Sequence, residues 1–193
     1  MKRPLIVKFG TSLIVGARGQ VRRQILRDRA REIAQLVRAG TPVCVVSSGA
    51  IALGLPRLGL ARRPRSMPKL QAASALGQAR LQAAWEAALG QEGIPAAQIL
   101  LTAVDVAERS TYVNARNALN ALFSLGAVPV VNENEATATD GITLGDNDPL
   151  AAQVAVLSRG RLLVLLTEVE GVLSRRPGTP DAQLIADGSI ARN

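Results

Sequence analysis

In the stretch LIVKFGTS at residues 5–12, a short, mainly apolar run is followed directly by small and polar residues. A continuous apolar run of this length, bounded by turn-forming residues, is typical of a strand that is buried on both faces. The stretch VCVVSSGA at residues 43–50 repeats the arrangement. Both stretches therefore predict buried strands, and these strands end where Gly10–Ser12 and Ser48–Ala50 begin.

Further strands and helices are expected to alternate along the rest of the chain. Strand-like runs lie at 98–102, 127–131 and 161–167, and helical patterns at 22–39, from Ile51, at 70–89, 113–125 and about 148–158. This alternation predicts a single α/β domain over residues 1–193, a three-layer α/β/α sandwich with a mainly parallel central sheet. Ligands bind such sheets at the carboxyl ends of the strands, so the polar residues that follow the strands are the candidate site.

The composition agrees with this fold and excludes several other classes of protein. Of the 193 residues, 48% are hydrophobic but only 2% are aromatic, which suits helices layered on a sheet. The single Cys44 lies inside an apolar run, which excludes a disulfide framework and predicts a buried thiol. No apolar run approaches the roughly 18–20 residues that span a bilayer, and the first residues make a poor signal peptide. We therefore expect a cytoplasmic protein without a membrane partner.

The formal net charge of +8 is unevenly distributed. Residues 1–65 contain 14 Lys or Arg and 2 Asp or Glu, a balance of +12, whereas residues 66–193 contain 9 basic and 13 acidic residues, a balance of −4. Much of the excess is Arg within 22–38, where Leu26, Ala30, Ile33 and Val37 predict the apolar face of a helix and leave Arg on the solvated face. Two Phe, one Trp and one Tyr offer little base stacking, so no nucleic-acid partner is expected.

Lys8 and the residues Gly10, Thr11 and Ser12 that follow the first strand are candidates for binding phosphate. A glycine lets a phosphate approach backbone N–H groups closely, and the hydroxyl side chains add donors. The segment lacks the GxxxxGK[ST] pattern of a Walker A loop. A lysine near a strand end is also often a surface residue whose charge reaches solvent, and this alternative stays open.

Ser48, Gly49 and Ala50 lie at the predicted start of a helix, where free N–H groups and a hydroxyl suit an anion such as a carboxylate. A simple helix cap explains the same residues. The chain contains no His, so a Ser-His-acid hydrolase is excluded.

The segment 132–148 concentrates carboxylate and carboxamide side chains without any Lys or Arg. Its acids are Glu133, Glu135, Asp140, Asp146 and Asp148, and its amides are Asn132, Asn134 and Asn147. A carboxamide donates to a carboxylate and accepts from an ammonium group, so this combination suits the two charges of an amino acid. A solvated acidic loop is the alternative, and the spacing does not match an EF-hand.

Taken in order, these segments resemble the amino-acid kinase family and, within it, the glutamate 5-kinases. The motifs that carry the resemblance run along nearly the whole chain: VKFGTS, SSGAIALG, LGQARL with Trp85 downstream, ILLT, YVNARNAL, VPVVNENE, GDNDPLAA and LLVLLTEVEG. The resemblance implies ATP-dependent phosphorylation of the γ-carboxylate of L-glutamate, the first step of proline biosynthesis. It also implies Mg²⁺ as the companion of ATP, a homo-oligomer, and a functional link to glutamyl phosphate reductase.

The resemblance also implies a role for each matching residue. Lys8 would be the catalytic residue at the transferred phosphoryl group. ATP would be bound by Lys8, Gly10, Thr11, Ser12, Thr167 and Glu168. Glutamate would be bound by Ser48, Gly49, Ala50, Asn132, Glu135, Asp146, Asn147 and Asp148. No set of protein side chains is assigned to a metal.

The chain departs from the family pattern at several positions. The family usually has Asp where Glu135 and Glu168 stand, and its Tyr and Asp-Pro motif beside the adenine reads here as GVLSRRPG. The family's kinase domain also continues past residue 193, and many members add a PUA domain. The resemblance thus implies an incomplete domain, and a relic that binds glutamate without productive ATP binding is the alternative. Another amino-acid kinase is a second alternative, and a basic RNA-binding protein is a distant third.

Overall fold

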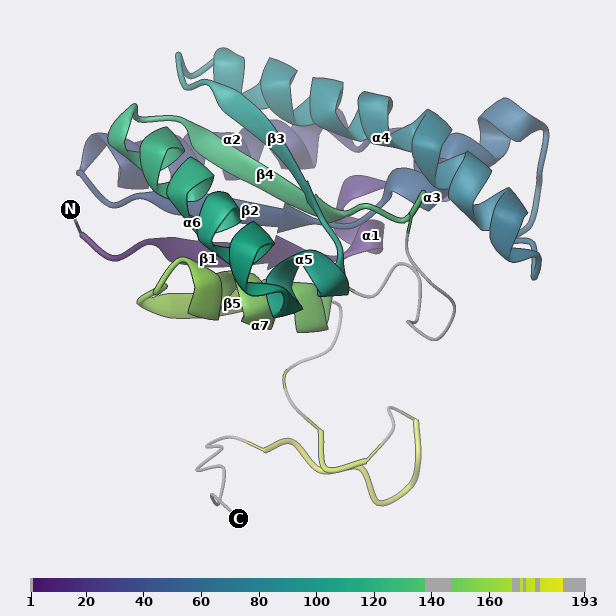
Figure 1. Ribbon diagram of the computed structural model, residues 1–193. Helices are drawn as coiled ribbons and strands as arrows, with labels where there is room; N and C mark the ends of the chain where they lie inside the picture. The colour runs from purple at the N-terminus through teal and green to yellow at the C-terminus, as the bar shows by residue number, and fades with distance from the viewer. Residues whose placement is uncertain (1, 138–146, 168–170, 172, 176–177, 186–193) are drawn as a thin grey trace.

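The computed structural model describes residues 2–137, 147–167, 171, 173–175 and 178–185. Its core is one five-stranded sheet in the order β3-β4-β2-β1-β5 (Figure 1). All pairings between these strands are parallel, as the sequence predicts. The strands are β1 (Leu5–Phe9), β2 (Val43–Ser47), β3 (Ala96–Leu101), β4 (Val128–Glu133) and β5 (Leu162–Leu166).

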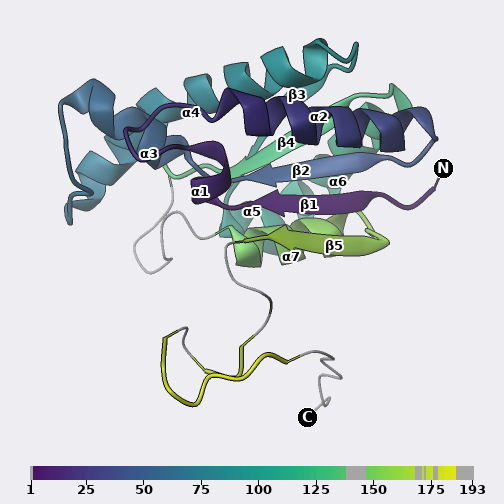
Figure 2. The same ribbon diagram turned by 180° about the vertical axis from the view of Figure 1, so that it is seen from behind.

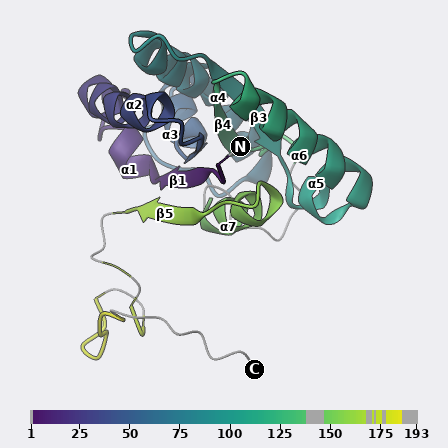
Figure 3. The ribbon, with the colours of Figure 1, turned by 90° about the vertical axis from the view of Figure 1, so that its left-hand side faces the viewer.

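Helices cover both faces of the sheet and complete the predicted three layers (Figures 1 and 2). One face carries α2 (Arg23–Arg38), α3 (Ala50–Gly54) and α4 (Met67–Gly90), and the other carries α5 (Ala103–Ala107), α6 (Arg109–Ser124) and α7 (Asp148–Leu157). Figure 3 shows the two groups on opposite sides of the strands. The short α1 (Thr11–Ile14) follows β1, and the 3₁₀ helix η1 (Leu55–Leu58) follows α3.

The alternation of side chains along each strand divides the core in two. Val7 and Phe9 of β1 pack in the cluster that includes α2 and α4, whereas Ile6 packs in the cluster that includes α6 and α7. This is the two-residue period of a strand. Lys8 has the parity of Ile6, and it reaches the N-terminus of α7. The strand period therefore decides which helix layer each functional side chain meets.

The boundaries of several elements differ from the sequence-based expectation. β4 continues through Asn132 and Glu133, beyond the predicted strand end at residue 131, because its pairing with β3 continues through both residues. β3 likewise begins at Ala96 rather than at Gln98. The short α5 was not expected at all, although Thr102 and Asp105 form a reciprocal capping box at its start. Cys44 is fully buried, as predicted.

Two glycines allow α3 and α4 to cross at close range. A Cβ added at Gly77 would lie 1.8 Å from the backbone oxygen of Ala50, and one at Gly54 would lie 1.8 Å from that of Ala73. No side chain larger than hydrogen fits either position without moving a backbone. This contact places the start of α3, and hence Ser48–Ala50, directly against α4.

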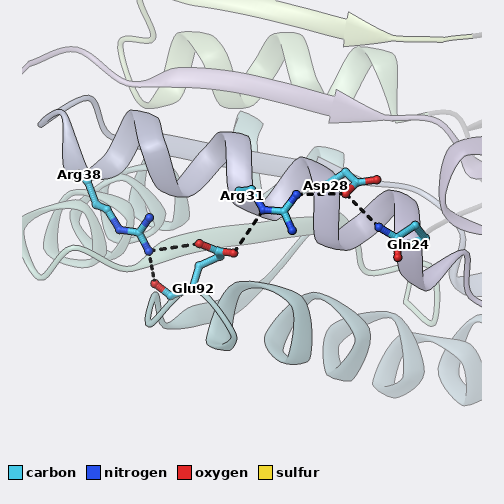
Figure 4. A network of polar contacts seen from close by, with 5 residues as sticks. All are labelled: Gln24, Asp28, Arg31, Arg38 and Glu92. Carbon is cyan, nitrogen blue, oxygen red and sulfur yellow. Dashed lines mark hydrogen bonds and ion pairs between the residues drawn. The ribbon is translucent and has the colours of Figure 1, made fainter.

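The arginine-rich face of α2 is solvated, as expected, and part of it contacts the turn after α4 (Figure 4). Arg38 donates to both the backbone oxygen and the carboxylate of Glu92, at 2.7 and 3.2 Å. Arg31 lies between Glu92 and Asp28, at 4.0 and 3.5 Å. Exposed pairs of this kind contribute little stability. These contacts give Arg31 and Arg38 partners within the protein, without any nucleic acid.

Within the described part of the chain, no helix combines the length and the apolar character needed to cross a membrane.

Candidate functional site

Six of the residues singled out by the sequence lie at or just beyond the carboxyl ends of β1, β2 and β4, or at the start of α7. These are Lys8, Ser48, Asn132, Glu135, Asn147 and Asp148. Lys8 and Asp148 meet directly, since the Lys8 Nζ lies 2.5 Å from an Asp148 carboxylate oxygen. The Lys8 side chain is only 10% exposed, whereas that of Asp148 is 49% exposed. The pair therefore holds a buried ammonium group at the edge of solvent, which is a suitable place for an anionic ligand.

The amides of Asn147 and Asn132 join the ends of β2 and β4. The Asn147 Nδ2 donates to the backbone oxygen of Ser47 at 3.2 Å and to the Asn132 Oδ1 at 2.7 Å. The Asn132 Nδ2 in turn donates to the Oε1 of Gln78 on α4, at 2.8 Å. All three amide side chains are buried. Segments that are far apart in the sequence are thus connected by one line of hydrogen bonds.

Glu135 is buried and accepts a hydrogen bond from the Ser74 hydroxyl of α4. Burial raises the pKa of the Glu135 carboxyl, because a carboxylate loses hydration there, while the Ser74 hydrogen bond lowers it. The nearby Glu133 raises this pKa further and Arg63 lowers it. Burial also raises the pKa of Glu133. A cationic group bound between these acids would favour their ionised forms.

Ser48 begins the turn from β2 into α3. Its N–H donates to the backbone oxygen of Phe9 at 3.0 Å, while its buried hydroxyl has no hydrogen-bond partner in the described part of the chain. Gly49 has a φ of 120°, which an L-residue with a side chain rarely adopts. The structure thus brings Ser48–Ala50 close to Gly77 of α4, and no described residue pairs with the Ser48 hydroxyl.

The residues expected on the nucleotide side are less enclosed. Gly10 follows β1, and its N–H already donates to the backbone oxygen of Leu166 at 3.2 Å. Thr11 and Ser12 begin α1 and are half-buried, and Thr167 follows β5 and is exposed. A pocket of about 430 Å³ lies beside them, with Phe9, Leu166 and Thr167 in its lining. Asp146 and Glu168 lie outside the described residues.

Three residues that the sequence patterns do not single out complete this arrangement: Ser47, Ser74 and Gln78. Trp85 donates to the Ser47 hydroxyl at 2.9 Å, so α4 contacts β2 as well as β4. Leu70, Ala73, Gly77 and Leu81 form a buried stripe on α4, and Ser74 and Gln78 interrupt it. Polar residues on a buried helix stripe need partners, and this signal was available in the sequence.

No group of three or more His, Cys, Asp or Glu side chains among the described residues is arranged to hold a metal ion. The protein groups at this site are hydrogen-bond donors and acceptors and singly charged side chains. They suit a small polar molecule that carries both an anionic and a cationic group.

Comparison with known proteins agrees with the resemblance seen in the motifs. The model of the amino acid kinase family matches residues 3–190. Curated proteins named glutamate 5-kinase are similar over most of this chain: the one from Sphingopyxis alaskensis is 49% identical over 179 residues, 92% of this chain and 49% of the relative. Those from Thermus thermophilus and Rhodopseudomonas palustris are 47% and 48% identical, over 90% and 95% of this chain and 46% and 49% of their own lengths. The chain spans about half the length of the curated relatives that it matches.

Proposed function

This chain belongs to the amino-acid kinase family, and from that premise we propose that it serves the ATP-dependent phosphorylation of the γ-carboxylate of L-glutamate. In this proposal Ser48–Ala50, Asn132, Glu135, Asn147 and Asp148 form the acceptor side of the site. The nucleotide side consists of Gly10, Thr11, Ser12 and Thr167, and Lys8 acts between the two. Asp146 and Glu168 are assigned by the resemblance alone.

The observation that carries the proposal is the position of Lys8. Asp148 forms an ion pair with the buried ammonium group of Lys8. Asp148 follows Asn147 in the sequence, and Asn147 is bonded to Ser47 at the end of β2 and to Asn132 on β4. A fixed positive charge beside carboxylate-binding and ammonium-binding groups is what phosphoryl transfer to an amino acid requires. Catalysis of this reaction consists mainly of positioning and of stabilising negative charge.

The chemistry needs no general base. The γ-carboxylate of glutamate has a reference pKa of about 4.3 and is therefore ionised and nucleophilic at neutral pH. This agrees with a chain that contains no His. The buried Glu135, whose pKa is raised, would be stabilised in its ionised form by the ammonium group of the substrate. Binding of the ammonium group and ionisation of Glu135 would then support each other.

The described residues fit Mg²⁺ only as a companion of ATP. Mg²⁺ at such sites is held largely by phosphate oxygens and water, with one or two carboxylates from the protein. Asp148 is the half-exposed carboxylate next to Lys8 and would be the residue to supply such a ligand. The bound ion would neutralise charge on the phosphates.

Titration calorimetry with L-glutamate and with Mg-ATP, each on its own, tests the proposal. We expect both ligands to bind and a hydroxamate assay to detect glutamyl phosphate when both are present. Glutamate binding without Mg-ATP binding would instead identify a relic that retains the acceptor side only. Failure to bind glutamate contradicts the proposal.

A further inference from the structure

The line of amide hydrogen bonds beneath the acceptor side has a direction. A backbone carbonyl can only accept, so the Ser47 oxygen requires Asn147 to present its Nδ2. The same Nδ2 donates to the Asn132 Oδ1, and the Asn132 Nδ2 is then turned toward the Gln78 Oε1. One immovable acceptor on β2 thus determines how the three side-chain amides are oriented.

In the part of the chain that the structure describes, this direction leaves one polar atom without a partner at each end of the line. The Asn147 Oδ1 and the Gln78 Nε2 are both buried and have no hydrogen-bond partner among the described residues. Unpaired buried polar atoms destabilise a fold, and they are rare enough to require an explanation. The Asn147 oxygen is an acceptor without a donor, and a substrate ammonium group is a donor of the kind that it lacks.

Gln78 is the only member of the line that α4 supplies. Without its Oε1, the Asn132 Nδ2 would lose its acceptor, and the Asn132 amide could turn over and present Nδ2 to Asn147. The Asn147 Nδ2 would then face a second donor while it still bonds to the Ser47 oxygen, so its orientation would no longer be supported from both sides. The effect of Gln78 would therefore reach Asn147 through Asn132 rather than through direct contact with a ligand.

We propose, on the basis of the proposed function, that Gln78 is a positioning residue for the substrate's ammonium group. It holds Asn132, and through Asn132 it holds the Asn147 Oδ1 as an open acceptor. A residue that only fills space between α4 and β4 would affect all ligands of the site alike. A positioning residue for the ammonium group affects only those ligands that carry one.

The first test compares L-glutamate with glutarate, the dicarboxylate that lacks the ammonium group. Gln78→Met keeps the length of the side chain and removes the acceptor of the Asn132 Nδ2. We expect this variant to bind glutamate about tenfold more weakly, the effect of one lost charge-assisted hydrogen bond, while glutarate binding changes less than about threefold. Equal losses for the two ligands would assign Gln78 a merely structural role and overturn the proposal.

Gln82→Met is the matched control, one turn further along α4. Gln82 donates to the backbone oxygen of Ala96 at 3.4 Å and takes no part in the amide line. The same glutamine-to-methionine change should therefore leave the ratio of glutamate to glutarate affinity as it is in the unsubstituted chain. Calorimetry on the full chain measures all three proteins.

A second test measures the coupling between Asn132 and Gln78 by unfolding and needs no ligand. In Asn132→Asp, the new carboxylate still accepts a hydrogen bond from Asn147, and the Gln78 amide can turn over and donate to it. In Gln78→Glu, the new carboxylate still accepts a hydrogen bond from Asn132. In the double variant two carboxylates face each other, and neither can donate a hydrogen bond to the other while both are ionised. Urea unfolding should show a loss greater than the sum of the two single losses, and additive losses contradict the line. If the unsubstituted chain does not bind glutamate, the proposed function fails, and this cycle still decides whether the line exists.

Discussion

At the ends of β2 and β4, the polar residues Ser48, Asn132, Glu135 and Asn147 are buried, and hydrogen bonds link most of them to each other or to α4. Around the ends of β1 and β5, the polar residues Thr11, Ser12 and Thr167 are half-buried or exposed. Strand order explains the exposure of Thr167, because β5 lies at one edge of the sheet. β1 is an inner strand like β2 and β4, and the ends of β2 and β4 differ from it in that α4 supplies hydrogen-bond partners to Asn132 and Glu135. Polar groups between two helix layers must pair with protein, while groups at an edge can pair with water. The side that we propose for the acceptor substrate is thus organised by hydrogen bonds within the protein.

The same substitution at one glycine on each side should give the largest difference. Gly77→Ala places a Cβ 1.8 Å from the Ala50 oxygen, so α3 and α4 must separate, and we expect a loss of about 3 kcal/mol in unfolding free energy. Gly10→Ala meets only the Leu166 oxygen at 3.5 Å, an ordinary contact, and should cost less than about 1 kcal/mol. Urea unfolding of both variants checks this. Equal losses would show that the crossing of α3 and α4 has no special role.

A pair of serines provides the next comparison. Ser74→Ala removes the hydrogen bond to buried Glu135 and should lower the unfolding free energy by about 2 kcal/mol at neutral pH. The Ser12 side chain makes no hydrogen bond within the described part of the chain, so Ser12→Ala should stay within about 0.5 kcal/mol of the unsubstituted protein. Thermal unfolding distinguishes the two. A neutral effect of Ser74→Ala would mean that Glu135 is adequately solvated without this hydroxyl.

Lys8 connects the two sides, and its removal should affect the reaction more than the fold. If the chain is active, Lys8→Ala should lower kcat by at least about tenfold, or roughly 1.4 kcal/mol, because the transferred phosphoryl group loses a fixed positive charge. The hydroxamate assay measures this. Lys2, which donates to the Ala39 oxygen at the surface, provides the control substitution to Ala. An unchanged kcat in Lys8→Ala would remove Lys8 from the chemistry.

The smallest effect should be the pH dependence that Glu135 adds to stability. Burial raises the pKa of its carboxyl in the folded state, so the folded chain holds this proton to a higher pH than the unfolded chain does. The stabilising contribution is fully present below the ordinary carboxyl pKa and is lost as pH rises through the raised value. Glu135→Gln should therefore reduce the decline in stability with rising pH. Part of the decline should persist, because the pKa of Glu133 is raised as well.

Stability curves from mildly acidic to neutral pH check this prediction. Glu86→Gln, at an exposed position on α4, is the control and should leave the slope unchanged. A steeper decline in Glu135→Gln than in the unsubstituted chain would show that the ionised carboxylate is already well stabilised without a ligand.

Much of this architecture was predicted from local patterns. The parallel α/β sheet, all five strands and the buried Cys44 follow from short apolar runs separated by helical patterns, which neighbouring residues determine. The errors lie where distant pairing overrides local character. Asn132 and Glu133 are strand residues because β3 pairs with them, although their polarity suggests a loop. The roles of the individual site residues stay predictions until ligands are measured.

The sequence by itself determined which residues end each strand, because apolar runs, glycines and polar clusters are local signals. It therefore predicted that Lys8, Ser48, Asn132 and Asn147 lie near the carboxyl ends of the strands, where sheets of this class generally bind ligands. Only the tertiary structure decided what those residues touch. Gln78 and Ser74 meet Asn132 and Glu135 across 54 and 61 residues of chain. Such contacts depend on how closely α4 approaches the sheet and α3, and two glycines at the helix crossing control that approach.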